Sequence, residues 1–396
     1  MVANDAIGTN HSSAASSVPW APPRLLRPLV SVIVTNYNYA RFIGDCLSSI
    51  LAQDYRCFEV IVVDDVSTDG SPSVIRDFID GHPDGHRVSL HVCSKNGGQM
   101  AAFIEGFRLS KGSFVVFVDA DDWLFPDFLS THLEAHLNRM MPAALSCSDE
   151  IAVDVEGRLM TGTIEVRMPT GEKAQRLTPD LATYGNRIEG WRRGAVLSAA
   201  MDELPGKSGT AGSAHEPILD YVAPNANQGR SWIWTTTSAI MFRRGVLETV
   251  LHDRARDIRI CADFYLLHFS HLIGGTLLIR APLGAYRRHG SNNFATSGLI
   301  GTGAPSGKPG MGVTYATIWA RMRGEVQSRF AEFQLSMGEP QALRLLATLS
   351  TPGSFLSAAA TVGPARPAAI GKLAVFFAIQ RWRRVIAELR RLAHFT

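Results

Sequence analysis

The chain has 396 residues, with 39 lysines and arginines against 36 acids, and its formal net charge of +3 is too small to indicate a nucleic-acid-binding protein. Its length suffices for one large domain with an appendage or for two domains, and its 46% hydrophobic content is ordinary for a globular protein. The five cysteines form no C-x-x-C pair, which argues against a disulfide framework or a zinc site and favours a reducing compartment. Residues 1–20 do not resemble a signal peptide and no apolar run reaches about 18 residues, so we expect a cytoplasmic protein.

Residues 1–28 are rich in Ser, Ala, Asn and Pro and are predicted to form a disordered leader. A regular alternation follows, in which each apolar run typical of a strand is succeeded by a helical pattern. This βα repeat predicts an α/β fold with a mostly parallel central sheet flanked by helices. The predicted strands are Val30–Val34, Glu59–Val63, Val88–Val92 and Phe114–Val118, and the predicted helices are Ala40–Gln53, Ser71–Ile79, Gln99–Leu109 and Asp127–Asn138.

Each of these strands ends in a polar loop. In an open parallel sheet the carboxyl ends of the strands share one edge, and ligands bind there. Two of the loops contain glycines, which let main-chain N–H groups approach a ligand closely. The acids, the lysine and the small residues of these loops suit a sugar-phosphate ligand bound together with a cation. The loops are Thr35–Asn38, Asp64–Gly70, Ser94–Gly98 and Asp119–Asp122.

The fourth loop places three carboxylates within four positions, directly after a strand that is apolar throughout. Like charges this close repel one another, and their ionised forms need a cation or solvent to persist. A divalent cation with oxygen ligands is the simplest neutraliser. The alternative is a helix N-cap with additional surface acids, because helical sequence begins near Pro126.

The pattern after residue 142 is less regular. Ala143–Cys147 and Ile151–Val155 are predicted to be a fifth and a sixth strand. The region of about 161–230 is rich in Gly, Pro and charge, and it is predicted to be a long insertion over the edge of the sheet. A loop of this length typically serves as a substrate lid, and disorder is the alternative.

Regular patterns return at Trp232–Arg244, which predicts a polar turn followed by an apolar strand. A helix is predicted to begin near Cys261, with Asp263 in its first turn, where an acid can also simply compensate the helix dipole. Another strand is predicted at Thr276–Arg280, and the polar stretch Ala285–Asn293 closes the region.

Residues 301–396 are predicted to be a Gly/Pro-rich linker and a helical C-terminal extension. Helical patterns cover Thr314–Leu335, Pro340–Leu349 and Lys372–His394, and the last of these combines an apolar face with several arginines. A basic amphipathic helix can lie on an anionic membrane surface, which would make the protein peripheral at the inner face of the plasma membrane. The alternative is a helix that packs on the preceding domain and leaves its arginines in solvent.

Several of these stretches together resemble glycosyltransferase family 2, whose members have a GT-A-type fold. The resemblance rests on four stretches that occur in the family's order, each at the end of a predicted strand. A D-x-D triplet alone is frequent by chance. The resemblance covers residues 29–295 and implies a single GT-A-type domain at 29–300 that carries the insertion. The matching stretches are VSVIVTNYN (Val30–Asn38), FEVIVVDDVSTDGS (Phe58–Ser71), Asn96-Gly97-Gly98 and FVDADD (Phe117–Asp122), with weaker matches at TSAIMFRR (Thr237–Arg244), Ala262-Asp263 and YRRHGSN (Tyr286–Asn292).

The resemblance implies an inverting glycosyltransferase that moves a sugar from a nucleotide-diphosphate sugar, commonly UDP-linked, to an acceptor hydroxyl. It implies Mg²⁺ or Mn²⁺ as the cofactor and a role in the synthesis of cell-surface polysaccharide or glycoconjugates. The acceptor could be a carbohydrate, a lipid-linked molecule or a protein, and no nucleic-acid partner is implied. By position, the resemblance assigns nucleotide binding to Thr35, Asn36, Tyr37, Asp64, Asp65, Lys95, Asn96 and Asp119, and metal binding to Asp121, Asp122 and His289.

The resemblance also assigns the role of general base to Asp263. Many family members have an acid directly before this aspartate, where this chain has Ala262, and the difference leaves that match less tight. For His289 the alternative is a surface histidine in a basic turn.

Four other classes fit the sequence less well. Nucleotidyltransferases also hold a cation with acids at a sheet edge, but they usually carry a Gly/Arg-rich loop after the first strand, and Thr35–Asn38 contains neither residue. An inactive nucleotide-sugar-binding scaffold is disfavoured by the complete set of acids. A dinucleotide-binding domain is disfavoured because no G-x-G-x-x-G follows the first strand. A processive synthase usually has several transmembrane helices and a Q-x-x-R-W-type motif, which Gln380-Arg381-Trp382 matches only in part.

Overall fold

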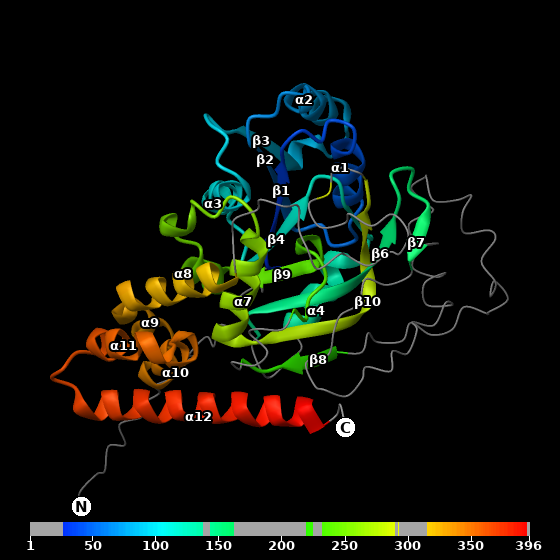
Figure 1. Cartoon of the computed structure of the whole chain (residues 1–396). Helices are drawn as coiled ribbons and strands as arrows, with labels where there is room; N and C mark the ends of the chain where they lie inside the picture. Colours follow the sequence, from blue (N-terminus) through cyan, green and yellow to red (C-terminus); the bar gives the residue numbers. More distant parts are fainter. Residues whose placement is uncertain are drawn as a thin grey trace, which may run out of the picture.

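Figure 1 shows the computed structural model of the chain, which describes residues 27–137, 143–161, 219–224, 232–289, 292 and 315–393. The predicted leader, the predicted insertion and the predicted linker lie wholly or mostly outside these residues.

Ten strands form one sheet in the order β3-β2-β1-β4-β9-β6-β10-β5, with β7 paired to β6 and β8 paired to β10. Strands β3, β2, β1 and β4 are parallel to one another, and β6 is parallel to β10, whereas β9 runs antiparallel to both β4 and β6. The sheet is therefore parallel in its first half and mixed in its second. The strands are β1 (Val30–Asn36), β2 (Phe58–Asp64), β3 (Val88–Val92), β4 (Phe114–Asp119), β5 (Trp123–Leu124), β6 (Leu145–Val153), β7 (Leu159–Thr161), β8 (Leu219–Val222), β9 (Ile240–Arg243) and β10 (Thr276–Arg287).

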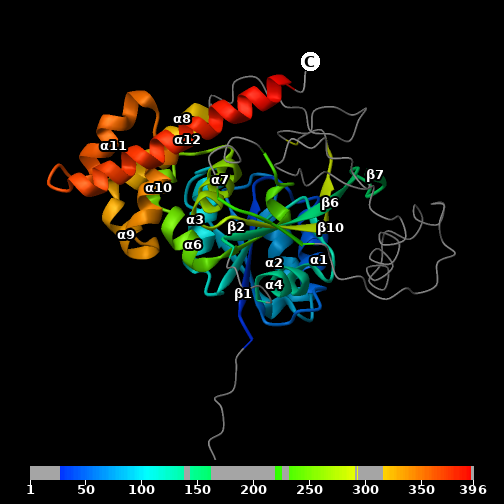
Figure 2. The ribbon, with the colours of Figure 1, turned by 90° about the horizontal axis from the view of Figure 1, so that it is seen from below.

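Helices cover both faces of the sheet, with α1, α2 and α4 on one side and α3, α6 and α7 on the other (Figure 2). The helices are α1 (Ile43–Leu51), α2 (Ser71–Gly81), α3 (Gln99–Leu109), α4 (Phe128–Leu137), α6 (Arg244–Val250), α7 (Ala262–Gly274), α8 (Tyr315–Ser328), α9 (Phe330–Met337), α10 (Glu339–Leu349), α11 (Phe355–Val362) and α12 (Pro367–Ala393). Short 3₁₀ helices lie at Gly85–Arg87, Thr237–Ala239, Asp253–Ala255 and Pro352–Ser354.

The apolar runs of β1 and β4 lack alternation because both faces of these central strands are covered. Every side chain of Val30–Val34 and of Phe114–Val118 is buried, which is typical of strands in the middle of an α/β sheet. Helix α3 approaches the sheet closely at Gly106, where a Cβ atom would lie 2.3 Å from Ile33 Cγ2. The predicted α/β class is confirmed, and the central strands position the loops that follow them.

The helices of the C-terminal extension continue the core on the α3 and α7 side of the sheet. Phe333 of α9 stacks on Phe269 of α7, with ring centroids 5.8 Å apart. Trp319 of α8 meets His268 of α7 edge to face at 5.9 Å. Among the described residues, no helix has both the length and the apolar character needed to cross a bilayer.

The first four βα units occur as predicted, and β3 and α3 have the predicted bounds. The prediction of separate fifth and sixth strands is wrong, since Leu145–Val153 forms the single strand β6. Asp149 and Glu150, which stand between the two predicted strands, lie buried within β6 and accept hydrogen bonds there.

Two other predicted bounds differ from the structure. Strand β10 continues beyond the predicted end at Arg280, because shifts in register on either side of Pro282 let the pairing with β6 resume. The predicted helix Thr314–Leu335 is two helices, α8 and α9, which Arg329 separates.

Candidate active site

Parallel pairing brings the polar loops to one edge of the sheet. Thr35 in β1 is in register with Asp119 in β4, and Asn36 is in register with Asp64 in β2. Strand β3 lies next to β2 and runs in the same direction, so the loop Ser94–Gly98 follows on the same edge. The four loops that the sequence predicted to converge therefore lie side by side.

Asp64 is fully buried and organises the loop after β2. Its Oδ2 accepts hydrogen bonds from Asn36 Nδ2 at 2.7 Å and from Ser67 Oγ at 2.6 Å, and its Oδ1 accepts one from the Ser67 N–H at 2.9 Å. A carboxylate with several such donors is held in one orientation. Asp64 and Asn36, both predicted to bind the nucleotide, thus support the loop that carries Asp65.

Asp65 connects the loops after β2 and β3. Its two oxygens accept the N–H groups of Gly97 at 2.8 Å and Gly98 at 2.7 Å, and Asn96 Nδ2 donates to its main-chain oxygen at 2.9 Å. Only glycine suits position 98, because its φ is +81° and a Cβ atom there would lie 2.8 Å from Arg259 Cα. The loop is therefore held by Asp65 on one side and by Arg259 on the other.

Three non-glycine residues near this edge have a left-handed backbone: Asn38 with φ 63°, Val66 with φ 64° and Cys261 with φ 61°. For a β-branched residue such as Val66 this conformation costs on the order of 1–3 kcal/mol. Asn38 and Val66 lie in the loops after β1 and β2, and Cys261 directly precedes α7. Strain of this kind concentrates at ligand-binding loops.

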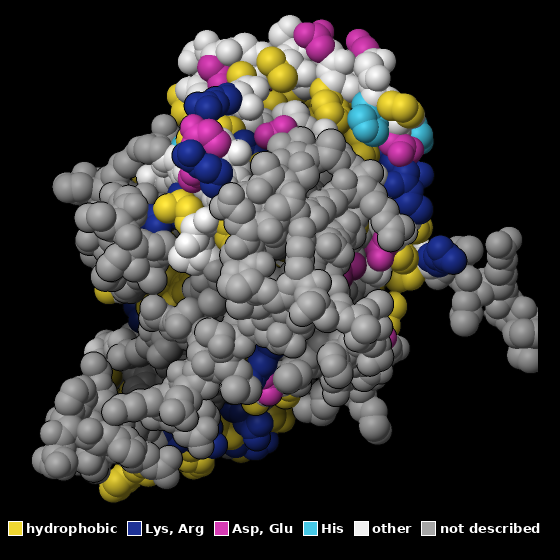
Figure 3. Space-filling view, turned by 90° about the vertical axis from the view of Figure 1, so that its right-hand side faces the viewer, with side chains coloured by type: hydrophobic (Ala, Val, Ile, Leu, Met, Phe, Trp, Pro, Cys, Tyr) yellow, Lys and Arg dark blue, Asp and Glu magenta, His cyan; other side chains and the backbone are white. Residues whose placement is uncertain are grey.

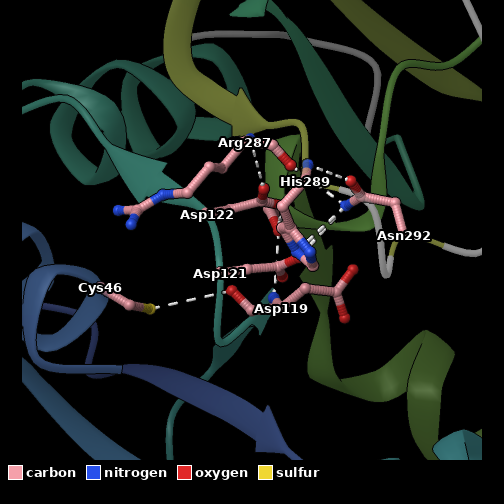
Figure 4. Close-up of polar contacts among 8 residues, drawn as sticks. Cys46, Asp119, Asp121, Asp122, Arg287, His289 and Asn292 are labelled. Carbon is pink, nitrogen blue, oxygen red and sulfur yellow. Dashed lines mark hydrogen bonds and ion pairs between the residues drawn. The ribbon is translucent and has the colours of Figure 1, made fainter. Parts of the chain in front are cut away.

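The acids at the end of β4 meet the segment that follows β10 (Figure 4). Asp121 is only 4% exposed, and its Oδ2 lies 2.7 Å from His289 Nε2 and 3.3 Å from Asn292 Nδ2. The His289 ring stacks on Phe42 with centroids 4.8 Å apart and meets Tyr39 edge to face at 5.6 Å. These aromatic contacts fix the imidazole plane, so that Nε2 is directed at Asp121.

Asp119 lies beside this pair and is partly exposed. Its Oδ1 accepts a long hydrogen bond of 3.4 Å from Thr35 Oγ1. Burial, together with the charges of Asp121 and Asp263, raises the pKa of Asp119 to about 8. The part of this shift that comes from Asp121 and Asp263 reflects the negative charge gathered at the site, which a bound cation would relieve.

Asp122, which was predicted to be a metal ligand, is fully buried and has other partners. Its Oδ2 accepts a hydrogen bond from Ser238 Oγ at 2.6 Å, and its Oδ1 accepts one from the Arg287 N–H at 3.1 Å. Burial and the charge of Asp121 raise the pKa of Asp122 well above its usual range. The side chain thus ties the end of β4 to β10 and to the turn before β9.

Arg287 places a buried guanidinium next to the acids. Its side chain is 3% exposed and lies between two rings, 4.3 Å from the centroid of Trp123 and 4.8 Å from that of Phe42. Its Nη2 pairs with Asp45 Oδ2 at 2.9 Å. The aromatic faces stabilise the cation where little water reaches it.

Asp263 lies in the first turn of α7, which begins at Ala262. Its Oδ1 accepts the Phe264 N–H at 2.8 Å, and burial raises the pKa of its carboxyl group. Because its charge also raises the pKa of Asp119, the two carboxylates lie near one another. A carboxylate with a raised pKa is a better proton acceptor than a solvated one.

Tyr37 and Lys95, two of the remaining residues predicted to bind the nucleotide, are exposed at this edge. Asn96 has a further partner, because the Arg259 guanidinium donates to both its side-chain and its main-chain oxygen. Tyr37 and Lys95 thus remain accessible to a ligand, whereas Asn96 is also part of the loop scaffold.

Sequence reasoning gave no role to Glu150, Ser238 or Asn292. Glu150 is fully buried in β6, where its Oε2 accepts hydrogen bonds from Thr236 Oγ1 at 2.8 Å and from Thr236 N at 3.2 Å. Its Oε1 has no hydrogen-bond partner in the described part of the chain, and burial raises its pKa to about 7. The adjacent acids Asp149 and Glu150 between the two predicted strands were the only signal for Glu150. Ser238 and Asn292 lie within the stretches Thr237–Arg244 and Tyr286–Asn292 that resemble the family, but neither residue was assigned a role there.

The candidate metal ligands at this edge fit a divalent cation that binds together with a diphosphate. Among the described residues, no group of three or more His, Cys, Asp or Glu side chains is arranged to hold a metal ion. Asp121 and His289 nevertheless converge, and Asp119 lies beside them with a raised pKa. Mg²⁺ typically keeps several waters and binds through one or two carboxylates together with substrate phosphates. A pair of protein ligands, Asp121 and His289, therefore suits a cation that is shared with a diphosphate. It does not suit a metal site enclosed entirely by protein.

Comparison with known proteins places the chain among sugar-transferring enzymes. The family model described as Glycosyl transferase family 2 matches residues 31–194. An uncharacterised glycosyltransferase of Nostoc sp. is 28% identical over 268 residues, which cover 68% of this chain and 67% of that protein. A putative teichuronic acid biosynthesis glycosyltransferase of Bacillus subtilis is 34% identical over 115 residues, which cover 28% of this chain but only 44% of that protein.

Among solved structures, residues 1–349 of TarS from S. aureus, crystallised with UDP-GlcNAc, align with 90% of this chain and 91% of that one. The sequence identity is 14% and the TM-score is 0.44.

Proposed function

We propose that this chain, which belongs to glycosyl transferase family 2 and is a glycosyltransferase, transfers the sugar of a nucleotide-diphosphate sugar to an acceptor hydroxyl with inversion at the anomeric carbon. One observation carries the proposal. The Asp121–His289 pair and the partly exposed Asp119 and Asp263 gather where the loops of the parallel strands end. Such an arrangement can hold a diphosphate and accept a proton close to it.

The donor would lie along the loops after β1, β2 and β3. Thr35 and Tyr37 would contact the base, Asp65 would present the glycine loop and hydrogen-bond the base, and Asp119 would contact the ribose. The exposed ammonium group of Lys95 would approach the phosphates. UDP is the nucleotide favoured by the family resemblance.

The reaction would proceed by direct displacement. The acceptor oxygen forms a bond to the anomeric carbon while the bond from that carbon to the diphosphate oxygen breaks, and the diphosphate leaves with the electron pair. Asp263 receives the proton of the acceptor hydroxyl, a contribution of about 10²–10⁴-fold in rate. Its burial favours this role because burial raises its pKa.

A divalent cation, Mg²⁺ or Mn²⁺, would be held by Asp121 and His289 together with the diphosphate. When bound, it would neutralise the charge that develops on the leaving group. Asp122 would position Asp121 rather than bind the cation, because both of its oxygens already accept hydrogen bonds from the chain.

The acceptor is the least determined part of the reaction. The Bacillus relative is named for teichuronic acid biosynthesis, and a relative in Escherichia coli, 31% identical over 134 residues, is named chondroitin synthase. We infer that the acceptor hydroxyl belongs to a growing cell-surface polysaccharide or glycoconjugate.

The test is a nucleotide-release assay with a panel of UDP- and GDP-sugars, with Mn²⁺ or with EDTA. Asp263→Asn should lower release by about 10³-fold while the fold and donor binding persist. Asp77→Asn, which changes an exposed acid on α2, serves as the matched control and should leave release unchanged.

Near-normal turnover of Asp263→Asn would refute the assignment of the base. Release of inorganic diphosphate instead of a nucleoside diphosphate would indicate a nucleotidyltransferase. Turnover that is indifferent to EDTA would remove the cation from the proposal.

A further inference from the structure

Helix α12 carries two apolar faces, and only one of them is covered. Leu373 is fully buried, and Phe376 and Phe377 pack against the core of the extension. The Phe377 ring lies 4.9 Å from that of Phe355 in α11, and the Arg344 guanidinium of α10 lies 5.0 Å above the Phe376 ring. These contacts attach the helix to α10 and α11.

The second apolar face is exposed. Val375, Ile379, Trp382 and Ile386 recur at spacings of three and four residues, so they form one stripe along the helix. Trp382 is 67% exposed and Val375 is 56% exposed. Val375 lies two residues beyond Leu373, which is more than half a helical turn, so the stripe points away from the body of the protein. Figure 2 shows α12 lying across the outside of the extension.

Positive charge borders this stripe. At 3.6 residues per turn, Lys372 and Arg383 fall on one flank of the stripe, whereas Arg381 falls closer to the covered face, where its guanidinium lies 6.0 Å from the centroid of the Phe377 ring. All three side chains are exposed. In Figure 3, basic and hydrophobic side chains lie next to one another along the lower edge of the molecule, the side on which Figure 1 places α12.

The charge of α12 contrasts with that of the remaining chain. Six of the 39 lysines and arginines but only one of the 36 acids lie within Pro367–Ala393. The helix therefore carries a net charge of +5, whereas the rest of the chain carries −2. Two copies of this helix would repel one another, so self-association through the stripe is electrostatically unfavourable.

We propose that the exposed stripe of α12 binds the surface of an anionic lipid bilayer, with the helix lying in the plane of the interface. An apolar face with a tryptophan, bordered by basic side chains, is the chemistry by which interfacial helices bind headgroups and acyl chains. The negative surface potential of such a bilayer complements the +5 helix. The proposal goes beyond sugar transfer and does not depend on the donor or on the assignment of the base.

The test is flotation of the full chain with vesicles of phosphatidylcholine and with vesicles of an equimolar mixture of phosphatidylcholine and phosphatidylglycerol. The chain should float with the mixed vesicles and much less with the neutral ones. Ile379→Ser combined with Ile386→Ser should weaken binding by about tenfold or more, because each isoleucine would lose its apolar contact. Val74→Ser on α2, an exposed apolar residue at the opposite end of the molecule in Figure 1, is the control and should bind normally.

The charge contribution is tested separately. Arg383→Gln should weaken binding to the mixed vesicles by about fivefold, and the matched Arg76→Gln on α2 should have no effect. Quenching of tryptophan fluorescence by brominated lipids should be strong in the wild type and should largely disappear in Trp382→Phe, although this variant still floats.

Equal flotation of the wild type and the double serine variant would overturn the proposal. So would light scattering that shows a wild-type dimer converted to a monomer by the serine substitutions, without lipid binding, because the stripe would then be an interface between copies. Activity on a soluble acceptor should be the same in all these variants, so either outcome leaves the proposed reaction unaffected.

Discussion

The two halves of the sheet use their carboxylates in different ways. In the parallel half, Asp64 and Asp65 accept main-chain N–H groups and fix the loops at the sheet edge. In the mixed half, Glu150 accepts hydrogen bonds from Thr236 and keeps one oxygen without a partner among the described residues, and burial raises its pKa to about 7. The parallel half therefore uses its carboxylates to fix loops, whereas the mixed half buries a carboxylate whose pKa is raised by that burial.

The largest expected effect is a loss of turnover, and it should differ between the neighbouring acids Asp121 and Asp122, which lie where the two halves of the sheet meet. Asp121→Asn should lower turnover by about 10³-fold, because on the proposed mechanism it removes a carboxylate that would hold the cation and, through the cation, the diphosphate. Asp122→Asn should cost only about tenfold, since on the proposed mechanism this acid acts through its neighbours: the amide oxygen can still accept the Arg287 N–H, and the amide NH2 can donate to Ser238 Oγ. Steady-state kinetics and Mn²⁺-dependent thermal shifts measure both variants, and an equal loss in the two would contradict the separation of roles.

Glu150→Gln should stabilise the cation-free protein at alkaline pH. The folded pKa of Glu150 is about 7 against an ordinary value of 4.5, so ionisation in the folded state is unfavourable. The resulting cost grows as pH rises from 4.5 to 7 and reaches about 3 kcal/mol above that range. Denaturant unfolding should therefore show a gain for the variant at pH 8 and little gain at pH 5.

Glu248→Gln, at an exposed position on α6, is the control for Glu150 and should show no pH-dependent gain. A gain of the same size for Glu150→Gln at both pH values would mean that charge burial is not its cause.

In the parallel half, Gly98→Ala should destabilise the Ser94–Gly98 loop by about 1–3 kcal/mol, because alanine is strained at positive φ and its Cβ would collide with Arg259. Nucleotide affinity should fall with it. Gly44→Ala in α1 is the matched control, since no atom lies within 4 Å of its Cβ and alanine favours a helix. Thermal melts and nucleotide titrations report both, and an unchanged Gly98→Ala protein would show that the loop is not fixed by this contact.

A separate effect, on the pH dependence of stability, concerns buried histidines on the α7 side of the sheet. Burial lowers the pKa of His268 to about 4 and that of His271 to about 3. Unfolded histidines take up protons below about pH 6.5, whereas these two do not until the pH is far lower, so stability should fall as pH decreases from 6.5. The slope should be up to about 1.4 kcal/mol per pH unit for each histidine.

His271→Gln should reduce this slope, and the exposed His86→Gln should not. The measurement is the free energy of unfolding between pH 7 and pH 4. An identical slope in the wild type and His271→Gln would assign the acid sensitivity to other groups.

The parallel half could be predicted from sequence because its information is local. An apolar run, a polar loop and a helix follow one another within each βα unit, and the loop after β4 identifies itself by its three acids. The mixed half could not be predicted in the same way. Ser238 reaches Asp122 across 116 positions, and the N–H of Arg287 reaches it across 165 positions, through strand pairings that no local pattern reveals.

The contact between Gly98 and Arg259 also has a consequence for the position of Asp263. The Gln99 N–H donates to the Arg259 oxygen at 3.1 Å, and Gln99 Oε1 accepts the Ala262 N–H at 3.2 Å. The chain entering α7 is therefore fastened to the same loop that Asp65 orients. On the proposed assignment of Asp263 as the base, one connected unit would therefore set the distance between the nucleotide sugar and this carboxylate.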